Sequence, residues 1–289
     1  MKGRHSRLAT DAVPQLTNME NFAALGHDIA KLWSTSGTQY LKGALSTIEL
    51  AVVATFIGCV IGLICGILQT IPHSKEDPPL RRGVLSLVRA IIRIYVEVFR
   101  GTPMILQAVF IFYALPYFSN NALRFDNVNV AAYFVVSINT GAYMAETVRG
   151  GILSIDPGQT EGAMAIGMNH FRTMTSVILP QTIRNIIPQI GNNLIINIKD
   201  TSVMFIIGYT ELFAVHKGAV GRTYLYFPSA VIEMGMYLCM TIICSVILRW
   251  WERKLDGPQN FDIATTDTLA LTSGTTNFVA KERKEDMHR

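Results

Sequence analysis

Hydrophobic residues along this 289-residue chain are gathered into long blocks rather than spread evenly through it. A helix that crosses a membrane needs about 20 mainly apolar residues. The first block starts only after about 40 mostly polar residues and has no small-residue cleavage site behind it, so it is not expected to be a removable signal. We therefore expect an all-α integral membrane protein with about five transmembrane helices, at roughly residues 44–71, 97–118, 129–148, 186–208 and 227–251.

Lysine and arginine residues are unevenly divided between the linkers that join these blocks. Cytoplasmic loops of membrane proteins carry an excess of these residues close to the spans. The linkers 72–93 and 149–185, together with the end of the last block, hold eleven of them, whereas the two alternate linkers hold three. The sequence therefore predicts an N-terminus outside the cell and a C-terminus in the cytoplasm.

More polar segments flank the hydrophobic blocks at both ends of the chain. Apolar residues between positions 22 and 33 recur at helical spacing, which predicts an interfacial helix before the first span. Residues 1–18 and the polar stretch after Asp256 have a composition typical of disorder. We therefore divide the chain into an N-terminal extension at 1–41, a transmembrane domain at 42–252 and a polar cytoplasmic tail at 253–289.

The composition argues against several classes of function. The net charge of +4 does not indicate nucleic-acid binding, because the basic residues lie beside the spans, where membrane orientation accounts for them. All four cysteines fall in predicted spans and the six histidines are scattered, so no metal site is expected. The chain contains no G-x-x-x-x-G-K-[ST] motif to hold a nucleotide, and no catalytic constellation, so we do not expect an enzyme.

One segment between two spans, EGAMAIGMNHFRTMTSVILP at 161–180, carries the most information about function. It resembles the cytoplasmic coupling loop of permease subunits in binding-protein-dependent ABC importers. That loop reads E-A-A, three residues, Gly, nine residues and I-x-L-P. This chain departs from the pattern at Gly162 and Val177, and matches it at Glu161, Ala163, Gly167, Leu179 and Pro180.

The coupling segment is expected to form a short exposed helix. Asp156-Pro157-Gly158 is a turn signal, and Gly167 is a helix stop, which predicts a helix over 159–168. On this helix Ala163, Ile166 and Met168 are expected to project as knobs into a groove on the ATPase. The resemblance implies that Glu161, Ala163, Gly167 and Met168 couple the chain to the ATPase.

Further strings narrow the resemblance to the polar amino acid subfamily of these permeases, of histidine, glutamine or arginine type. They read YVEVFRGTPMILQAVFIFYALP at 95–116, AYMAETVRGGILSIDPGQT at 142–160 and LPQTIRNIIPQIGNNLIINIKDTSV at 179–203. The resemblance covers about residues 42–252. It implies the type I ABC importer permease fold and import of a polar or charged amino acid across a prokaryotic cytoplasmic (inner) membrane.

The same resemblance implies a set of partners. These are two separate ATPase subunits, a second permease that is identical or related, and an extracytoplasmic amino acid binding protein, with membrane lipid around the spans. ATP and Mg²⁺ are expected on the ATPase, and no cofactor is expected on this chain.

Ionisable and amide side chains within the spans are candidates for the substrate path. Charged groups at membrane depth are costly and face the protein interior or a wet cavity. In one interpretation these groups bind the ammonium and carboxylate of an amino acid. In the other, the three charged residues form a network that holds helices together or gates the path. The candidates are Asn139, Glu146, Asn193, Asn197, Lys199 and Asp200.

Four further residues are expected to have structural roles. Gly101 and Pro103 in the RGTP string predict a helix break, and Arg100 is expected to bind the carbonyl groups that the break leaves free. Pro180 belongs to the coupling frame. Two acid–base pairs at i, i+3 spacing, Glu97 with Arg100 and Glu146 with Arg149, are expected to neutralise each other.

Two other classes of protein remain as alternatives. A self-sufficient secondary transporter would use the membrane acids as ion or proton relays and would show internal inverted repeats, of which none is clear. A membrane enzyme would need the catalytic constellation that the sequence lacks. The first alternative predicts transport by this chain alone.

Overall fold

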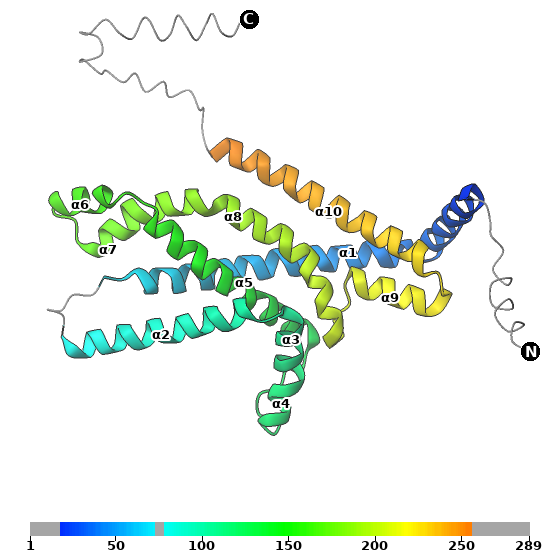
Figure 1. The fold of residues 1–289 in the computed structure, drawn as a ribbon, viewed down its shortest axis with the longest axis horizontal. Helices are drawn as coiled ribbons and strands as arrows, with labels where there is room; N and C mark the ends of the chain where they lie inside the picture. Colours follow the sequence, from blue (N-terminus) through cyan, green and yellow to red (C-terminus); the bar gives the residue numbers. More distant parts are fainter. Residues whose placement is uncertain (1–17, 73–77, 256–289) are drawn as a thin grey trace, which may run out of the picture. The chain divides into compact units, whose positions relative to one another are not determined.

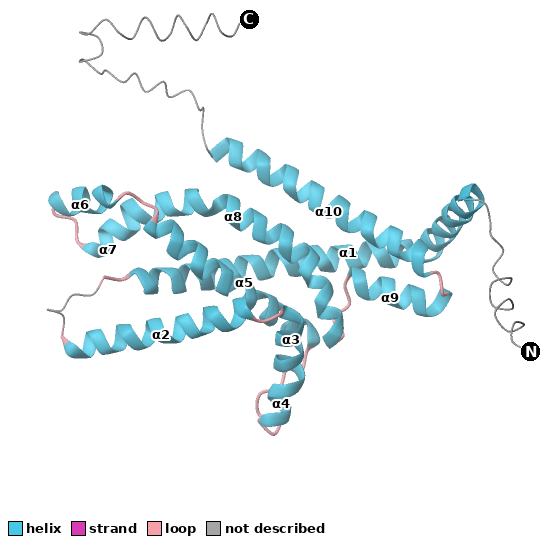
Figure 2. Cartoon of the chain, viewed as in Figure 1, coloured by secondary structure: helices cyan, strands magenta, loops and turns pink. Residues whose placement is uncertain are grey.

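The computed structural model describes residues 18–72 and 78–255, and this part of the chain is helical without a strand (Figures 1 and 2). The predicted disorder of residues 1–18 and of the stretch after Asp256 lies outside the described residues, except at Asn18, which begins the first helix. The elements are α1 Asn18–Thr70, α2 Pro79–Gly101, α3 Met104–Val109, the π-helix η1 Phe110–Ala114, α4 Leu115–Phe118, α5 Val128–Leu153, α6 Pro157–Ala165, α7 His170–Thr173, the π-helix η2 Met174–Ile178, α8 Leu179–Asp200, the 3₁₀-helix η3 Thr201–Ile207, α9 Leu212–Thr223 and α10 Tyr226–Leu255.

Three of the described helices are long and apolar enough to cross a membrane by themselves, in α1, α5 and α10. Two further segments meet the same requirements of length and apolar composition only as bent pairs of helices. Residues 79–101 and 104–118 meet at 113°, and residues 170–207 and 212–223 meet at 53°. The described chain thus has three to five candidate spans, where the sequence predicted about five.

Helix α1 is longer than expected, because the interfacial helix predicted at 22–33 is continuous with the first span. The polar residues that follow position 33 do not break the helix. The hydroxyl groups of Ser34 and Thr35 both donate to the carbonyl of Lys31, within the same helix. Leu32 and Tyr40 are buried in a core shared with residues of α8, α9 and α10, so this part of α1 packs on the chain itself.

A glycine ridge at Gly58, Gly62 and Gly66 brings α1 against α5. A Cβ atom at Gly62 would lie 2.2 Å from the Cβ of Met144, and one at Gly58 would lie 2.7 Å from the Cβ of Thr140. Such distances leave no room for a side chain. Small residues at four-residue spacing let two helices approach closely in a membrane, where no hydrophobic force drives them together.

Helix α5 lies at the centre of the described helices, in contact with α1, α2 and α8 (Figure 1). A buried polar junction ties three of them together. The side-chain amide of Asn197 on α8 donates to Thr55 Oγ1 of α1 at 2.7 Å and to Thr140 Oγ1 of α5 at 3.0 Å. Hydrogen bonds between membrane helices add about 0.6–2 kcal/mol each, so this junction fixes the rotation of the helices more than it stabilises them.

Candidate coupling and transport sites

The predicted coupling helix is present as α6, with a defined cap at each end. The Asp156 carboxylate accepts a hydrogen bond from the backbone N–H of Gly158 at 2.7 Å, and Pro157 occupies the first turn. At the other end Gly167 has φ +85°. Its N–H donates to Met164 O at 2.9 Å, and the N–H of Met168 donates to Ala163 O at 3.1 Å. This is a Schellman motif, which stops the helix.

The structure corrects which side chains this helix exposes. It ends at Ala165, so Met168 lies beyond it and not within it as predicted. Ala163 is only 6 % exposed and therefore faces the chain itself, so it is not a knob. The exposed apolar side chains are Ile166, at 79 %, and Met164, at 51 %. Met164 was missed because the coupling-loop pattern includes Ala163 and not Met164. Which face of so short a helix is exposed depends on its packing, which the pattern does not specify.

Helix α6 is joined closely to two of the long helices. It follows α5 after only three residues and packs against α7 and η2, which lead directly into α8 (Figure 1). The Asn169 side chain caps α7 by accepting from the N–H of Arg172 at 2.9 Å, and Pro180 lies in the first turn of α8. A force applied to α6 would therefore be passed to α5 and α8.

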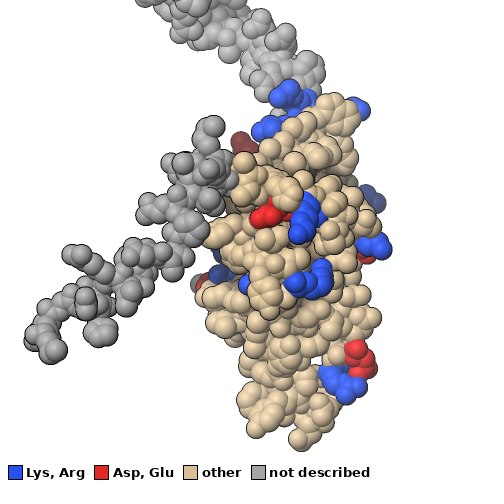
Figure 3. Space-filling view, turned by 90° about the vertical axis from the view of Figure 1, so that its right-hand side faces the viewer, with Lys and Arg blue, Asp and Glu red and all other residues tan. Residues whose placement is uncertain are grey.

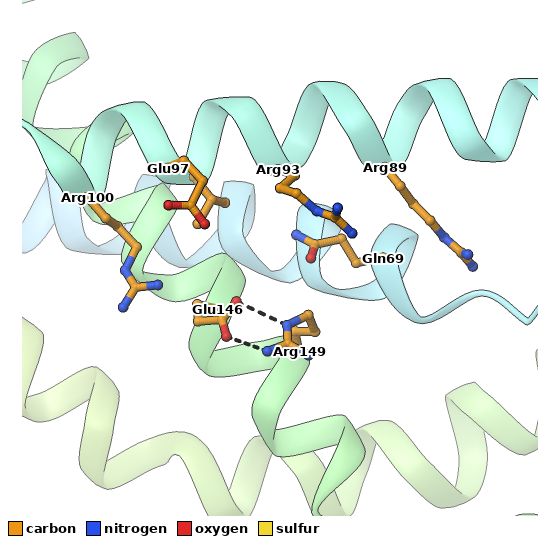
Figure 4. Close-up of a pocket in the computed structure, with 8 residues that line it drawn as sticks. Gln69, Arg89, Arg93, Glu97, Arg100, Glu146 and Arg149 are labelled. Atoms are coloured by element: carbon orange, nitrogen blue, oxygen red, sulfur yellow. Dashed lines mark hydrogen bonds and ion pairs between the residues drawn. The ribbon is translucent and has the colours of Figure 1, made fainter.

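A charged cleft of about 430 Å³ opens between the C-terminal part of α1, helix α2 and helix α5 (Figure 4). Four arginines and two glutamates line it, so its formal charge is positive. The side chains of α2 project toward Glu146 and Arg149 of α5, and those two form the predicted i, i+3 ion pair, with Nε to Oε2 at 3.0 Å. The charged residues are Arg89, Arg93, Glu97, Arg100, Glu146 and Arg149.

The helix break predicted from the RGTP string is present. The carbonyl groups that it leaves free are not bound by Arg100, as predicted, but by other side chains. Helix α2 ends at Gly101, and Pro103 caps α3. Arg100 lies over the ring of Tyr143 at 5.6 Å and lines the charged cleft; it forms no ion pair with Glu97 within 4 Å. The free carbonyls are instead bound by Gln107, as described next.

Gln107 and Asn139 satisfy the backbone at this break. The Gln107 amide donates to the carbonyls of Phe99 and Thr102, both at 2.9 Å, and the Asn139 amide donates to Phe99 O at 3.2 Å. Gln107 is 7 % exposed and was not singled out from the sequence. A lone glutamine four residues after a proline in an apolar run was the available signal, since a helix break leaves carbonyls that need a donor.

The asparagines expected along the substrate path are engaged inside the chain. Asn193 donates to the carbonyl of Gln189 in its own helix, and Asn197 forms the junction with α1 and α5. With Asn139 at the helix break, all three amides therefore have structural partners.

The structure does not bring the three charged candidates into one network. Glu146 pairs with Arg149 in the charged cleft, whereas Lys199 lines a separate cavity beside α10. Helix α8 ends at Asp200 and continues as the 3₁₀-helix η3, so Lys199 and Asp200 lie where the helical geometry changes. Sequence reasoning overlooked Glu211 and Glu233, although an acid close to an apolar span is itself a signal.

Uncharged surface dominates the face of the molecule shown in Figure 3, where charged side chains gather in a few small groups. Large apolar side chains on α1, α2 and α10 are exposed, as expected where lipid or another membrane subunit replaces water. Fold and surface together define a helical integral membrane protein with a capped, exposed helix between two of its spans.

Comparison with known proteins identifies the family. Residues 80–257 match the family described as "Binding-protein-dependent transport system inner membrane component". The chain belongs to this family of inner-membrane transport subunits, which are not themselves catalytic.

Curated relatives and solved structures agree with this assignment. The glutamine transport system permease protein GlnP of Escherichia coli K12 is 36 % identical over 215 residues, covering 74 % of this chain and 92 % of the relative. The putative GlnP of Rickettsia prowazekii is 32 % identical over the same lengths. A chain from the crystal structure of an amino acid ABC transporter with histidines superposes with a TM-score of 0.66 at 30 % identity, covering 76 % of this chain and 96 % of that one. The inward-facing MetNI methionine ABC transporter shares the fold, with a TM-score of 0.57 at 20 % identity over 76 % of this chain and 99 % of that one.

Proposed function

We propose that this chain is the permease subunit of an ATP-driven importer that moves a polar or charged amino acid across the inner membrane. The observation that carries the proposal is the capped helix α6, with Met164 exposed on it and Ile166 exposed at its C-cap. The relatives named for glutamine and the solved transporter with histidines support an amino acid as the substrate. No single substrate is implied, because the relatives differ in what they carry.

Energy for transport comes from elsewhere in this proposal. Two ATPase subunits hold ATP and Mg²⁺, and α6 inserts into a groove on one of them as a helix-in-groove contact. Glu161 and Gly167 stay in the coupling site, since both are exposed on or next to α6. Ala163 supports α6 from beneath, and Met168 closes its cap.

The predicted orientation remains part of the proposal. With the N-terminus outside and the tail at 253–289 in the cytoplasm, the linker that contains α6 lies on the cytoplasmic side, where an ATPase reaches it. A second permease, identical or related, completes the pathway, and an extracytoplasmic binding protein delivers the amino acid. The N-terminal extension at 1–41 would begin on the outer side.

The charged cleft is the best candidate for the inner part of the substrate path. Arg149 lies four residues before the end of α5, about one helical turn from the linker that leads to α6. Movement of α6 would therefore change the shape of the cleft. Glu146 remains a path candidate on this ground, while the engaged amides of Asn139, Asn193 and Asn197 favour structural roles.

Reconstitution tests the proposal directly. The permease co-purified with its ATPase and placed in proteoliposomes loaded with ATP should take up labelled amino acid when the binding protein is supplied outside. The permease alone should hydrolyse no ATP and transport nothing. Accumulation by the permease alone, driven by a sodium or proton gradient, would instead establish a secondary transporter.

A further inference from the structure

Helix α2 exposes a continuous row of large apolar side chains, which we call the α2 stripe. Its residues follow one another at alternating spacings of four and three, and each is at least 49 % exposed. Side chains at this spacing lie along one side of a helix. The stripe consists of Leu80, Val84, Leu87, Ile91, Ile94 and Val98.

A second exposed face of α2 lines the charged cleft and carries excess positive charge. Across the cleft Glu146 and Arg149 neutralise each other, which leaves three arginines against one carboxylate. Arg93 is exposed, and no carboxylate lies within 4 Å of it in the described ion pairs. The cleft therefore favours an anion. The residues that project from this face of α2 are Arg89, Arg93, Glu97 and Arg100 (Figure 4).

The end of α1 contributes a further donor to the cleft. Arg89 donates a hydrogen bond to the carbonyl of Ile71, just after α1, and so holds the end of α1 against α2. Gln69 lines the cleft, and its side-chain nitrogen is buried without a hydrogen-bond partner in the described part of the chain. A buried donor without an acceptor is costly, so an anionic oxygen at this wall would be stabilised.

The charged face and the α2 stripe lie next to each other on the helix. With 3.6 residues per turn, Glu97 and Arg93 lie about 60–100° round the helix from Ile94. The residues between the two faces are small and exposed, so no bulky side chain separates them. They are Gly83, Ser86 and Ala90.

This pairing of surfaces suits an amphiphile with an anionic head group. Basic pockets between membrane helices on the cytoplasmic side bind anionic lipid head groups, and anionic lipids give that leaflet its negative surface potential. The predicted orientation places the arginine-rich start of α2 on this side. A free anion would fill the cleft but leave the α2 stripe uncovered, whereas a phospholipid would cover both.

We propose that α2 binds an anionic phospholipid of the cytoplasmic leaflet, with Arg89 and Arg93 holding the phosphate and an acyl chain lying along Leu87, Ile91 and Ile94. Arginine suits this role because its guanidinium binds phosphate through two parallel hydrogen bonds. The inference goes beyond the proposed function, because the lipid is a resident ligand and not the cargo. Since the cleft also borders the proposed substrate path, the bound lipid would regulate transport.

The test compares two lipids on the purified permease–ATPase complex in neutral detergent, without ATP or amino acid. Native mass spectrometry measures the binding of phosphatidylglycerol and of phosphatidylcholine, which has the same acyl chains but no net charge. Phosphatidylglycerol should bind about 20-fold more tightly, at about fivefold for each of two arginines. Inorganic phosphate in large excess should displace little of it, because phosphate cannot occupy the α2 stripe.

Substitutions on the two faces should have different effects. Arg93→Gln should weaken phosphatidylglycerol about fivefold and leave phosphatidylcholine unchanged. Arg93→Lys keeps the charge but loses the paired hydrogen bonds, so its affinity should fall between the two. Ile91→Ser should weaken both lipids alike. Arg184→Gln on α8 and Arg249→Gln on α10 are the matched controls, since both arginines are exposed near predicted cytoplasmic ends, and both should bind normally.

Four outcomes would overturn the site. Equal binding of the two lipids would refute it, and displacement by inorganic phosphate would make the cleft a site for a free anion. An equal loss in Arg93→Gln and both controls would indicate a general surface field. A photoreactive group at position 91 should label lipid, and labelling of another protein subunit would show that a helix covers the α2 stripe.

These results are separate from the test of the proposed function. Uptake that still requires the ATPase would keep the importer function even if no lipid binds. Gel filtration of each variant shows whether the complex still assembles. The comparison of the two lipids on the unmodified complex does not depend on any variant.

Discussion

The side-chain amide of Asn139 on α5 donates a hydrogen bond of 2.9 Å to the side-chain oxygen of Gln107 on α3. The same Gln107 closes the backbone of the break between α2 and α3. A single buried glutamine thus fixes a 113° bend and ties it to the central helix. The bend depends on a tertiary contact as well as on Gly101 and Pro103.

Replacing this glutamine should destabilise the fold. Gln107→Leu keeps the volume but removes the donors to Phe99 O and Thr102 O, at a cost of about 1–3 kcal/mol. The midpoint of thermal unfolding of the detergent-solubilised permease should fall. Gln189→Leu, an exposed glutamine on α8, is the matched control and should leave the midpoint almost unchanged. Equal unfolding midpoints for the two variants would show that the helix break does not depend on the Gln107 hydrogen bonds for its stability.

A methyl group on the glycine ridge should push α1 away from α5. Gly62→Ala would place a Cβ 2.2 Å from the Cβ of Met144, so the two helices must separate, at a cost of about 1–3 kcal/mol. Gly83→Ala, in open space on α2, should instead be neutral or slightly stabilising. Thermal unfolding of both variants compares them, and the same midpoint in each would contradict the close contact.

The left-handed conformation of Gly167 should be needed for coupling. Gly167→Ala forces a side chain into φ +85°, which costs about 1–2 kcal/mol and loosens the cap of α6. Gly162→Ala, on the same helix and in open space, should tighten the helix by about 1 kcal/mol. The measurement is amino acid taken up per ATP hydrolysed, which should fall only in Gly167→Ala. Wild-type coupling in that variant would remove the cap from the mechanism.

Ile166 should be the main apolar contact with the ATPase. Ile166→Asp changes a side chain that is 79 % exposed, so the permease itself should remain stable. Burying the new carboxylate in an apolar groove is unfavourable, and ATPase recovered by co-purification should drop by about tenfold or more. Leu123→Asp, similarly exposed on a linker predicted to lie outside, is the control and should retain the ATPase. Normal recovery with Ile166→Asp would place the contact elsewhere.

Thiol labelling of intact cells tests the orientation. In a background without the four native cysteines, Gly221→Cys at the end of α9 should react with an impermeant reagent from outside. Pro78→Cys and His170→Cys should react only after the membrane is opened, because both lie in the arginine-rich linkers. The reverse pattern would put α6 out of reach of a cytoplasmic ATPase.

Much of the coupling site followed from local sequence. The turn signal at Asp156 and the glycine at 167 act within one helical turn, so they fix the ends of α6 wherever the helix is placed. Which side chains α6 exposes could not be predicted from local sequence, because Ala163 is buried by packing against the rest of the linker. The continuity of α1 was also missed: the hydroxyl groups of Ser34 and Thr35 bond back to the carbonyl of Lys31 and do not break the helix.

The sequence by itself determined the apolar spans, the charge asymmetry between the linkers, the helix break at Gly101 and Pro103, and the capped coupling helix. These depend on transfer into lipid and on backbone geometry, which neighbouring residues decide. Only the tertiary structure decided that Asn197 joins Thr55 to Thr140, that Glu146 and Lys199 lie in different cavities, and that Glu233 lines the second of these. Such contacts join residues far apart in the chain, and each depends on how the helices rotate and pack against one another.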